Sequence, residues 1–372
     1  MKDYDFKVSA AGRINIMGEH VDYCGGKVMP ASISLKNTVY ARPNGTDKIN
    51  ISWTNLPDSV TLETDRLADY KGLKYVSYQA GAAFVWQRAG HKIEGCDLLY
   101  DCSIPFGGGL SASAAIEVST IAALATVAGE EFDKLDVALK SREAECEYVG
   151  VNCGIMDQYA SACGKKDSAM LLDCNTLECE YLPLKLGGYS LVITNSEKAH
   201  NLVKSKYNER RAEADAALKI LRRKLDLKCL ADLSISNFKS YATMLPKTLK
   251  KRVEHVVNEC ERVRLASLAL KVGNMEMLGR LLNLSHASLR DNYEVTGKEP
   301  DALVEAAQSQ SCCLGSRLIG GGFGGCTLSL VKSGSVDEFK EFVGSSYYRA
   351  TGCKASFYDT EIADGITVTK LN

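Results

Sequence analysis

The segment that decides the fold reads Pro105-Phe106-Gly107-Gly108-Gly109-Leu110-Ser111-Ala112-Ser113-Ala114-Ala115. It follows a predicted strand at residues 96–104 and opens a predicted alanine-rich helix at residues 111–127. Three consecutive glycines leave backbone N–H groups accessible to a ligand. The start of the helix adds unpaired N–H donors and the positive end of its dipole. The order of strand, glycine-rich turn and helix therefore suits a polyphosphate.

The spacing of this segment excludes two common nucleotide-binding motifs, because it matches neither GxxxxGK[ST] nor GxGxxG. A tight strand-to-helix turn with a serine as the helix N-cap explains the same residues without any ligand. Taken alone, the segment leaves both interpretations open.

A second polar cluster lies near the start of the chain, in Gly12-Arg13-Ile14-Asn15-Ile16-Met17-Gly18-Glu19-His20-Val21-Asp22-Tyr23. Its arginine, asparagine, histidine and two acids place many donors and acceptors beside apolar strand positions. A polyhydroxylated ligand such as a sugar needs this inventory. The alternative is a solvated turn after an edge strand.

Two shorter segments carry weaker signals. In Asn152-Cys153-Gly154-Ile155-Met156-Asp157-Gln158, one acid sits among small and apolar residues, where it could orient or deprotonate a hydroxyl. Capping a helix is the commoner role of such an aspartate. The glycines of Ile319-Gly320-Gly321-Gly322-Phe323-Gly324-Gly325-Cys326 permit close approach of the backbone to a ligand or to another loop.

A chain of 372 residues is longer than one common domain, and we expect two closely packed domains at residues 1–183 and 184–372. Periodicity predicts strands at 8–16, 38–41, 49–53, 96–104, 190–195 and 326–331. Helices are predicted at 111–127, 133–148, 203–225 and in further segments to about 289. Ser335 and Glu338 form a capping-box pattern that predicts one more helix start.

Charge and composition narrow the range of partners. Lys and Arg total 45 against 46 acidic residues, so no broad basic surface for nucleic acid or anionic membranes is expected. The N-terminus carries no apolar core of a signal peptide, which predicts a cytosolic protein. The 14 cysteines form no CxxC pair and are expected to be reduced, and the five histidines show no spacing typical of metal ligands.

Together and in this order, the four segments resemble the GHMP kinase superfamily and, within it, the galactokinase family. Residues 12–23 are similar to the galactokinase signature GRxNxxGEHxDY, residues 105–115 to the superfamily ATP loop, and residues 320–326 to its third motif. The resemblance spans nearly the whole chain. It implies an α+β, two-domain GHMP kinase fold with the active site in the interdomain cleft, and a monomer that uses ATP and Mg2+ to phosphorylate the anomeric hydroxyl of galactose.

The resemblance also implies roles for individual residues. The residues expected to bind the sugar are Glu19, His20, Asp22, Gly154 and Tyr207. Asp157 is expected at the anomeric hydroxyl, with Arg13 beside it. The residues expected to hold ATP are Gly107, Gly108, Gly109, Leu110, Ser111, Ser113 and Ala114. Ser113 and Glu145 are expected to serve Mg2+, which prefers such hard oxygen ligands.

The chain departs from the family pattern at a few positions. Ala11 stands at a usual proline, Cys24 at a usual asparagine or aspartate, and Ala199 where many members have a basic residue, although Lys198 and Lys204 are near in sequence. Two other functions stay open. One is a related kinase for N-acetylgalactosamine, arabinose or galacturonate, and the other is a galactose sensor without enzymatic activity.

Overall fold

The computed structural model describes residues 3–73, 76–198 and 203–371, without the side chains at 203 and 204. Within this part of the chain the strands form three sheets. The largest has six strands in the order β13-β1-β3-β6-β4-β5 and is antiparallel except where β4 pairs with β6. Its strands are β1 (Phe6–Asn15), β3 (Pro30–Pro43), β4 (Lys48–Trp53), β5 (Ser59–Glu63), β6 (Cys96–Cys102) and β13 (Thr367–Lys370).

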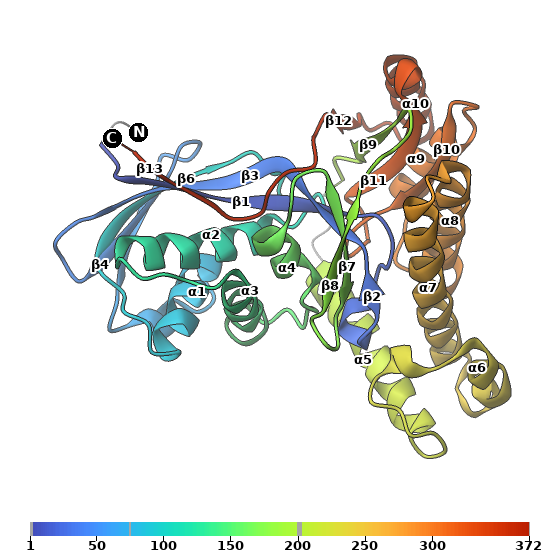
Figure 1. The fold of residues 1–372 in the computed structure, drawn as a ribbon, viewed down its shortest axis with the longest axis horizontal. Helices are drawn as coiled ribbons and strands as arrows, with labels where there is room; N and C mark the ends of the chain where they lie inside the picture. The colour runs from blue at the N-terminus through green and yellow to red at the C-terminus, as the bar shows by residue number, and fades with distance from the viewer. Residues whose placement is uncertain (1–2, 74–75, 199–202, 372) are drawn as a thin grey trace.

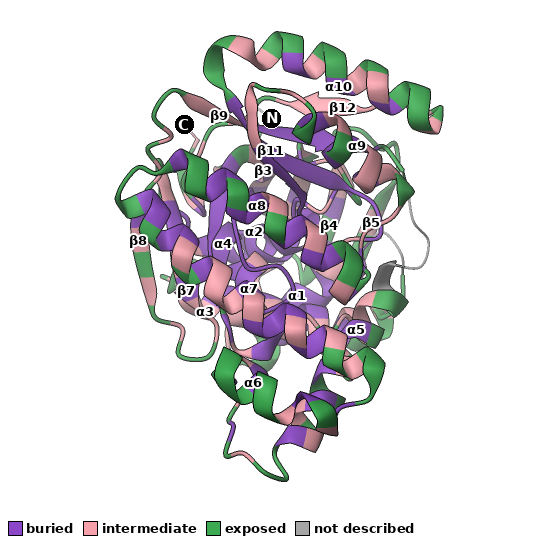
Figure 2. Cartoon of the chain, turned by 90° about the vertical axis from the view of Figure 1, so that its right-hand side faces the viewer, coloured by how far each residue is buried: buried purple, intermediate pink, exposed green. Residues whose placement is uncertain are grey.

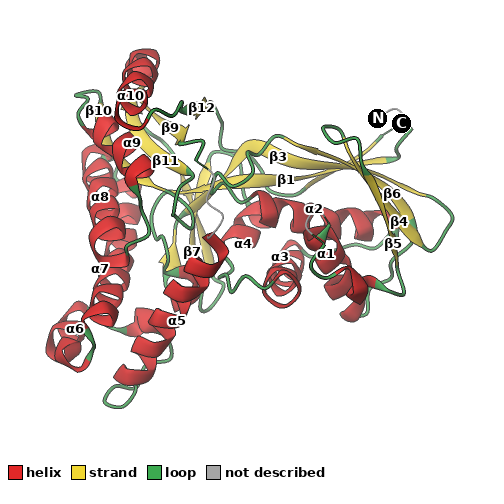
Figure 3. Cartoon of the chain, turned by 180° about the vertical axis from the view of Figure 1, so that it is seen from behind, coloured by secondary structure: helices red, strands yellow, loops and turns green. Residues whose placement is uncertain are grey.

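Four helices cover one face of this sheet (Figures 1 and 3). They are α1 (Ser77–Arg88), α2 (Ala112–Val127), α3 (Lys134–Glu143) and α4 (Met156–Cys163). Helix α2 contacts strands β1 and β3 and also its three neighbouring helices. Its alanines and serines allow this close approach on every side, and nearly all of its residues are buried. The alanine-rich composition is therefore that of a central, buried helix.

The second half of the chain forms a four-stranded antiparallel sheet, β10-β11-β9-β12, covered by helices. Its strands are β9 (Tyr189–Asn195), β10 (Cys313–Leu318), β11 (Cys326–Lys332) and β12 (Ser356–Tyr358). The helices are α5 (Val203–Leu221), α6 (Ile235–Tyr241), α7 (Lys247–Lys271), α8 (Met275–Ser288), α9 (Lys298–Gln308) and α10 (Val336–Thr351). Helices α8 and α9 contact the sheet, and α10 packs on α9.

A small sheet joins the two halves. Its strands are β2 (Lys27–Val28), β7 (Ser168–Asp173) and β8 (Cys179–Pro183). It contacts β3 of the large sheet on one side and α7 on the other. Buried residues follow the strands and the inner helix faces, whereas α6 and α10 expose much of their surface (Figure 2). The last strand, β13, returns to pair with β1. The division at residues 183 and 184 stays a prediction.

The predicted strands and helices are confirmed, with differences at their ends. Helix α5 ends at Leu221 and not at residue 225, because Arg223 and Lys224 donate to the third residue before them and tighten the last turn. The guanidinium of Arg222 also binds the carbonyl of Leu227, which fixes the returning chain. The helix start predicted at Ser335 is confirmed, because α10 begins at Val336, but the capping box itself does not form. A 3-10 turn takes Ser335 to φ −121° and ψ 13°, outside the extended conformation of a capping serine, and its side chain caps nothing.

All 14 cysteines are free, as expected. In the part of the chain that the structure describes, no helix combines the length and apolar character needed to cross a membrane.

One packing contact sets how closely helix α8 approaches strand β10. A β-carbon added at Gly315 would lie 2.0 Å from the carbonyl oxygen of Gly279, so the two backbones touch. We expect Gly315→Ala to lower the free energy of unfolding by about 2 kcal/mol or more, since the clash involves backbone and cannot be relieved by a rotamer change. Urea denaturation measures this. Gly334→Ala, where an added methyl meets open space, is the control. Equal urea midpoints for the two variants would contradict the prediction.

Candidate active site

The polar segments of the sequence converge at one place, where β1 ends, α2 and α4 begin, and the loop between β10 and β11 crosses. A small cavity and a larger, more apolar cleft meet there. Arg13, Asp157, Tyr207 and Gly321 line both. A ligand in the small cavity and a ligand in the cleft would therefore face each other across these four residues.

The centre of the site is an ion pair between Arg13 and Asp157. Arg13 Nε donates to Asp157 Oδ1 and its Nη2 to Oδ2, each at 2.9 Å. The third nitrogen, Nη1, donates to the carbonyl of Gly109 at 2.5 Å. The arginine side chain is 3% exposed and the aspartate side chain 31%. The carboxylate is thus held from behind by the guanidinium and remains accessible from the cavities.

The small cavity is lined by all five residues expected to bind the sugar. Burial, and next the negative charge of Asp157, raise the pKa of Asp22 to about 7. A β-carbon at Gly154 would lie 2.0 Å from Asp22 Oδ2, so only glycine leaves room for that carboxyl. The aromatic rings of His20 and Tyr207 lie 5.5 Å apart at their centroids. Burial lowers the pKa of His20 to about 3, which keeps the imidazole neutral.

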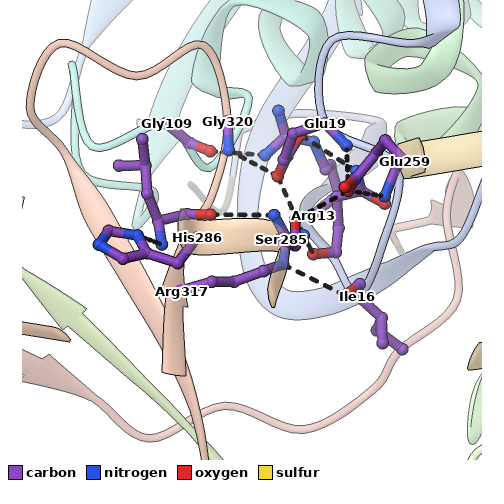
Figure 4. Close-up of polar contacts among 12 residues, drawn as sticks. Arg13, Ile16, Glu19, Gly109, Glu259, Ser285, His286, Arg317 and Gly320 are labelled. Atoms are coloured by element: carbon purple, nitrogen blue, oxygen red, sulfur yellow. Dashed lines mark hydrogen bonds and ion pairs between the residues drawn. The ribbon is translucent and has the colours of Figure 1, made fainter. Parts of the chain in front are cut away.

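Glu19 also lines the small cavity, but protein donors hold its carboxylate. Asn15 Nδ2 donates to Oε2 at 3.0 Å, and the Gly320 N–H donates to Oε1 at 2.9 Å (Figure 4). Arg317 Nη2 lies 3.2 Å from Oε1, and both members of this ion pair are buried. Glu19 therefore connects the first polar segment to the loop of the third glycine motif.

Sequence reasoning missed the residues that hold this turn in place. Arg317 Nε donates to the carbonyl of Ile16 at 3.3 Å. Glu259 of α7 accepts from the N–H groups of Gly18 and Glu19 at 3.0 and 3.3 Å (Figure 4). Although burial acts to raise it, Arg262 and His255 bring the pKa of Glu259 down to about 2. The sequence signal that could have identified Arg317 and Glu259 is a charged residue among the apolar residues of a predicted strand or helix.

The two glycine-rich loops pack on each other. The N–H of Cys326 donates to the carbonyl of Gly108 at 2.9 Å. A β-carbon at Gly320 would lie 2.7 Å from Gly109 O, and one at Gly325 would lie 3.0 Å from Gly108 O. Of the two roles expected for residues 319–326, contact with another loop is therefore confirmed.

The residues expected at the nucleotide divide into two groups. Gly107, Gly109, Ser111 and Ser113 line the cleft. Gly108, Leu110 and Ala114 do not line it, and all three are buried. Ala199 lies outside the described residues, as does the side chain of Lys204. Lys198 lines a neighbouring hollow and pairs with Glu299 at 3.6 Å.

Ser113 and Glu145 meet at the floor of the cleft. Burial and then the charge of Asp157 raise the pKa of Glu145 to about 7, against the lowering effect of the Ser113 hydroxyl. Gln158 Nε2 donates to Glu145 Oε2 at 2.5 Å. A hydroxyl and a carboxylate deprived of solvent suit a divalent cation, whose charge would favour the ionised form. Other ligands would have to come from water and the nucleotide, because no group of three or more His, Cys, Asp or Glu in the described chain could hold a metal.

Comparison with known proteins agrees with this geometry. Residues 2–43 match the galactokinase galactose-binding signature, residues 75–165 the GHMP kinase N-terminal domain and residues 266–350 the GHMP kinase C-terminal domain. The galactokinase of Clostridium tetani is 41% identical over 95% of this chain and 91% of its own length. That of Clostridium perfringens is 43% identical over 96% and 93%. The chain belongs to the galactokinase family.

The fold comparison extends this assignment. The Lactococcus lactis galactokinase, whose crystal structure is a complex with galactose, superposes with a TM-score of 0.96 at 39% identity, over 98% of this chain and 95% of the other. A mevalonate kinase superposes with a TM-score of 0.67 at 17% identity, over 96% and 99%, and so shares the fold. The predicted α+β GHMP kinase fold is therefore confirmed for this galactokinase family member.

The buried carboxyl of Glu145 gives a prediction with a defined sign. In metal-free protein it stays protonated up to about pH 7, whereas in the unfolded chain it ionises near 4.5. Between these values the folded state binds more protons, so Glu145 makes the free energy of unfolding fall as the pH rises. Relative to Glu145→Gln, the unsubstituted protein should lose up to about 3 kcal/mol between pH 4.5 and 7.5.

Urea denaturation with a chelator present measures this difference. Glu147→Gln is the control, since Glu147 lies on the same turn but is 55% exposed and screened by solvent. A difference between Glu145→Gln and the unsubstituted protein that stays constant with pH would contradict the prediction.

Proposed function

We propose that this chain transfers the γ-phosphate of ATP to the anomeric hydroxyl of galactose, giving galactose 1-phosphate and ADP. Membership of the galactokinase family supports the reaction. The observation that carries the proposal is the Arg13–Asp157 pair on the wall shared by the small cavity and the cleft. A sugar in the first and a triphosphate in the second would meet at this pair.

The chemistry of the pair suits phosphoryl transfer. Such reactions pass through a loose transition state, so positioning and charge stabilisation account for most of the acceleration. The accessible carboxylate of Asp157 would orient the anomeric hydroxyl and accept its proton as the O–P bond forms. The guanidinium of Arg13, buried beside it, would stabilise the charge that spreads over the transferred group.

The cleft suits the nucleotide. Gly107 and Gly109 have positive φ angles of 72° and 73°, and a side chain at Gly107 would stand in open space, where the backbone is accessible. We assign Ser113 and Glu145 to Mg2+. When bound, the metal would neutralise charge on the phosphates.

Galactose is favoured over the other sugars considered. The L. lactis protein that superposes on nearly the whole chain was crystallised with galactose. The small cavity is lined by His20 and Asp22, polar groups that would stay unpaired if an epimer presented a hydroxyl wrongly, whereas protein donors already hold Glu19. A sensor without activity is disfavoured because Ser113 and Asp157 are intact. A cytosolic monomer stays a prediction from the sequence.

A substrate panel tests the proposed function. ADP release would be measured with ATP, Mg2+ and, in turn, galactose, glucose, arabinose, galacturonate and N-acetylgalactosamine. We expect galactose to exceed glucose in kcat/KM by about 100-fold or more, since unpaired buried polar groups penalise the wrong epimer. Equal turnover of galactose and glucose would overturn the substrate assignment, and ADP release with none of the sugars would favour a sensor.

Gly154 provides a test of the sugar pocket itself. An alanine there would push its β-carbon against the Asp22 carboxyl. We expect Gly154→Ala to raise KM for galactose about 10-fold or more, with KM for ATP nearly unchanged, because the displaced group is on the sugar side. Gly297→Ala, where a methyl meets open space, is the matched control. Initial rates with each substrate varied in turn would decide, and an effect on ATP alone would exclude Asp22 from the sugar site.

A further inference from the structure

Unfavourable backbone conformations cluster around the site. In the described chain, seven residues other than glycine have positive φ: His20, Ser111, Asp167, Leu177, Glu197, Glu294 and Phe323. Four of them, His20, Ser111, Glu197 and Phe323, line the small cavity, the cleft or the hollow beside them. Such conformations persist only where the surroundings enforce them, and they gather at functional sites.

Ser111 has the clearest consequence, because it occupies the N-cap position of α2. A capping serine has an extended backbone, and its oxygen accepts from an N–H of the first turn. Ser111 has φ 62° and ψ 43° and makes no such bond. Its hydroxyl instead donates to Asp157 Oδ2 at 2.6 Å. The left-handed backbone thus directs the hydroxyl away from its own helix and toward the start of α4.

The contact completes the set of donors around Asp157. Arg13 fixes the plane of the carboxylate through both oxygens. Ser111 adds a third donor to Oδ2, from the loop that also forms the wall of the cleft. That loop is itself tied to Arg13, whose N–H donates to Leu110 O at 3.1 Å and whose Nη1 donates to Gly109 O. The orientation of the carboxylate is therefore set jointly by β1 and by the glycine-rich loop.

We propose that Ser111 is a positioning residue for Asp157, and that the left-handed backbone at residue 111 serves to aim its hydroxyl at that carboxylate. This inference rests on the proposed function, in which Asp157 orients the acceptor hydroxyl. In this inference the Ser111 side chain orients the carboxylate of Asp157, the proton acceptor, and only the backbone of the loop binds the phosphates. A misplaced carboxylate would slow phosphoryl transfer without weakening either substrate.

Two variants distinguish the contribution of the Ser111 hydroxyl from that of the strained backbone at residue 111. Ser111→Ala removes the hydroxyl and keeps a side chain in the left-handed conformation, whereas Ser111→Gly removes both. We expect kcat to fall between about 10-fold and 100-fold in both variants, with KM for galactose and for ATP within about two-fold of the original. Ser111→Gly should nevertheless melt about 2 °C above Ser111→Ala, because glycine adopts this conformation without strain.

Ser119→Ala is the matched control. Ser119 is a fully buried serine of the same helix whose hydroxyl donates to Ala115 O at 2.7 Å. Its loss should lower the melting temperature and leave kcat nearly unchanged. If Ser111 only supported the fold, activity would instead follow stability, and the glycine variant would be more active than the alanine variant. That result would overturn the inference.

A double-mutant cycle tests whether Ser111 affects kcat through Asp157. Asp157→Asn alone should lower kcat about 100-fold or more. In that background Ser111→Ala should change kcat less than about two-fold, since the two residues act as one unit. Full additivity, or a rise in KM for ATP with normal kcat, would contradict the proposal and assign the hydroxyl to the nucleotide. Failure of the unsubstituted protein to phosphorylate galactose would reject the proposed function, whereas normal kcat in both Ser111 variants would reject only the inference.

Discussion

The arrangement of the site depends on a single buried guanidinium. Arg13 binds the carboxylate of Asp157 through two nitrogens and the carbonyl of Gly109 through the third. An arginine that is 3% exposed would be strongly destabilising if any of these partners were removed, because its charge would be left buried and unpaired. The end of β1, the glycine-rich loop and the start of α4 must therefore meet at this side chain. The two cavities lie on either side of the meeting point.

A second buried charge pair fixes the opposite side of the small cavity. Glu19 and Arg317 are 298 residues apart in sequence. Removing such ions from water costs several kcal/mol each, so the pair is retained only where further hydrogen bonds satisfy it. The backbone of Asn15, Ile16 and Gly320 supplies them. This network fixes the position of the N-terminal turn relative to the loop between β10 and β11. It also over-determines the turn enough to hold His20 at φ 61°.

Local sequence was sufficient for the elements and for the segments that form the site. Periodicity identified β1, β4, β6, β9 and α2, because hydrophobic spacing is a short-range property. The partners of those segments could not be read from spacing. Glu259 accepts from the N–H of Gly18, which is 241 residues away in sequence. The residues near either position do not identify its partner. At Ser335 the capping pattern located the start of α10 correctly, but the cap itself does not form, because the preceding turn sets the backbone. Ser111 was assigned to ATP from its motif, although its hydroxyl is aimed at Asp157.

The glycines of the two loops couple the small cavity mechanically to the cleft. Gly109 faces the cleft and Gly320 faces the small cavity, and their backbones are in contact with no side chain between them. Gly109 is also bound to Arg13, and Gly320 to Glu19. Rigid backbone contacts transmit displacement more directly than mobile side chains, because they have no rotamers to absorb it. A shift of the glycine-rich loop would therefore also move the backbone of Gly320, which lines the small cavity. The density of glycine in both loops follows from this requirement for contact as much as from the need to approach phosphates.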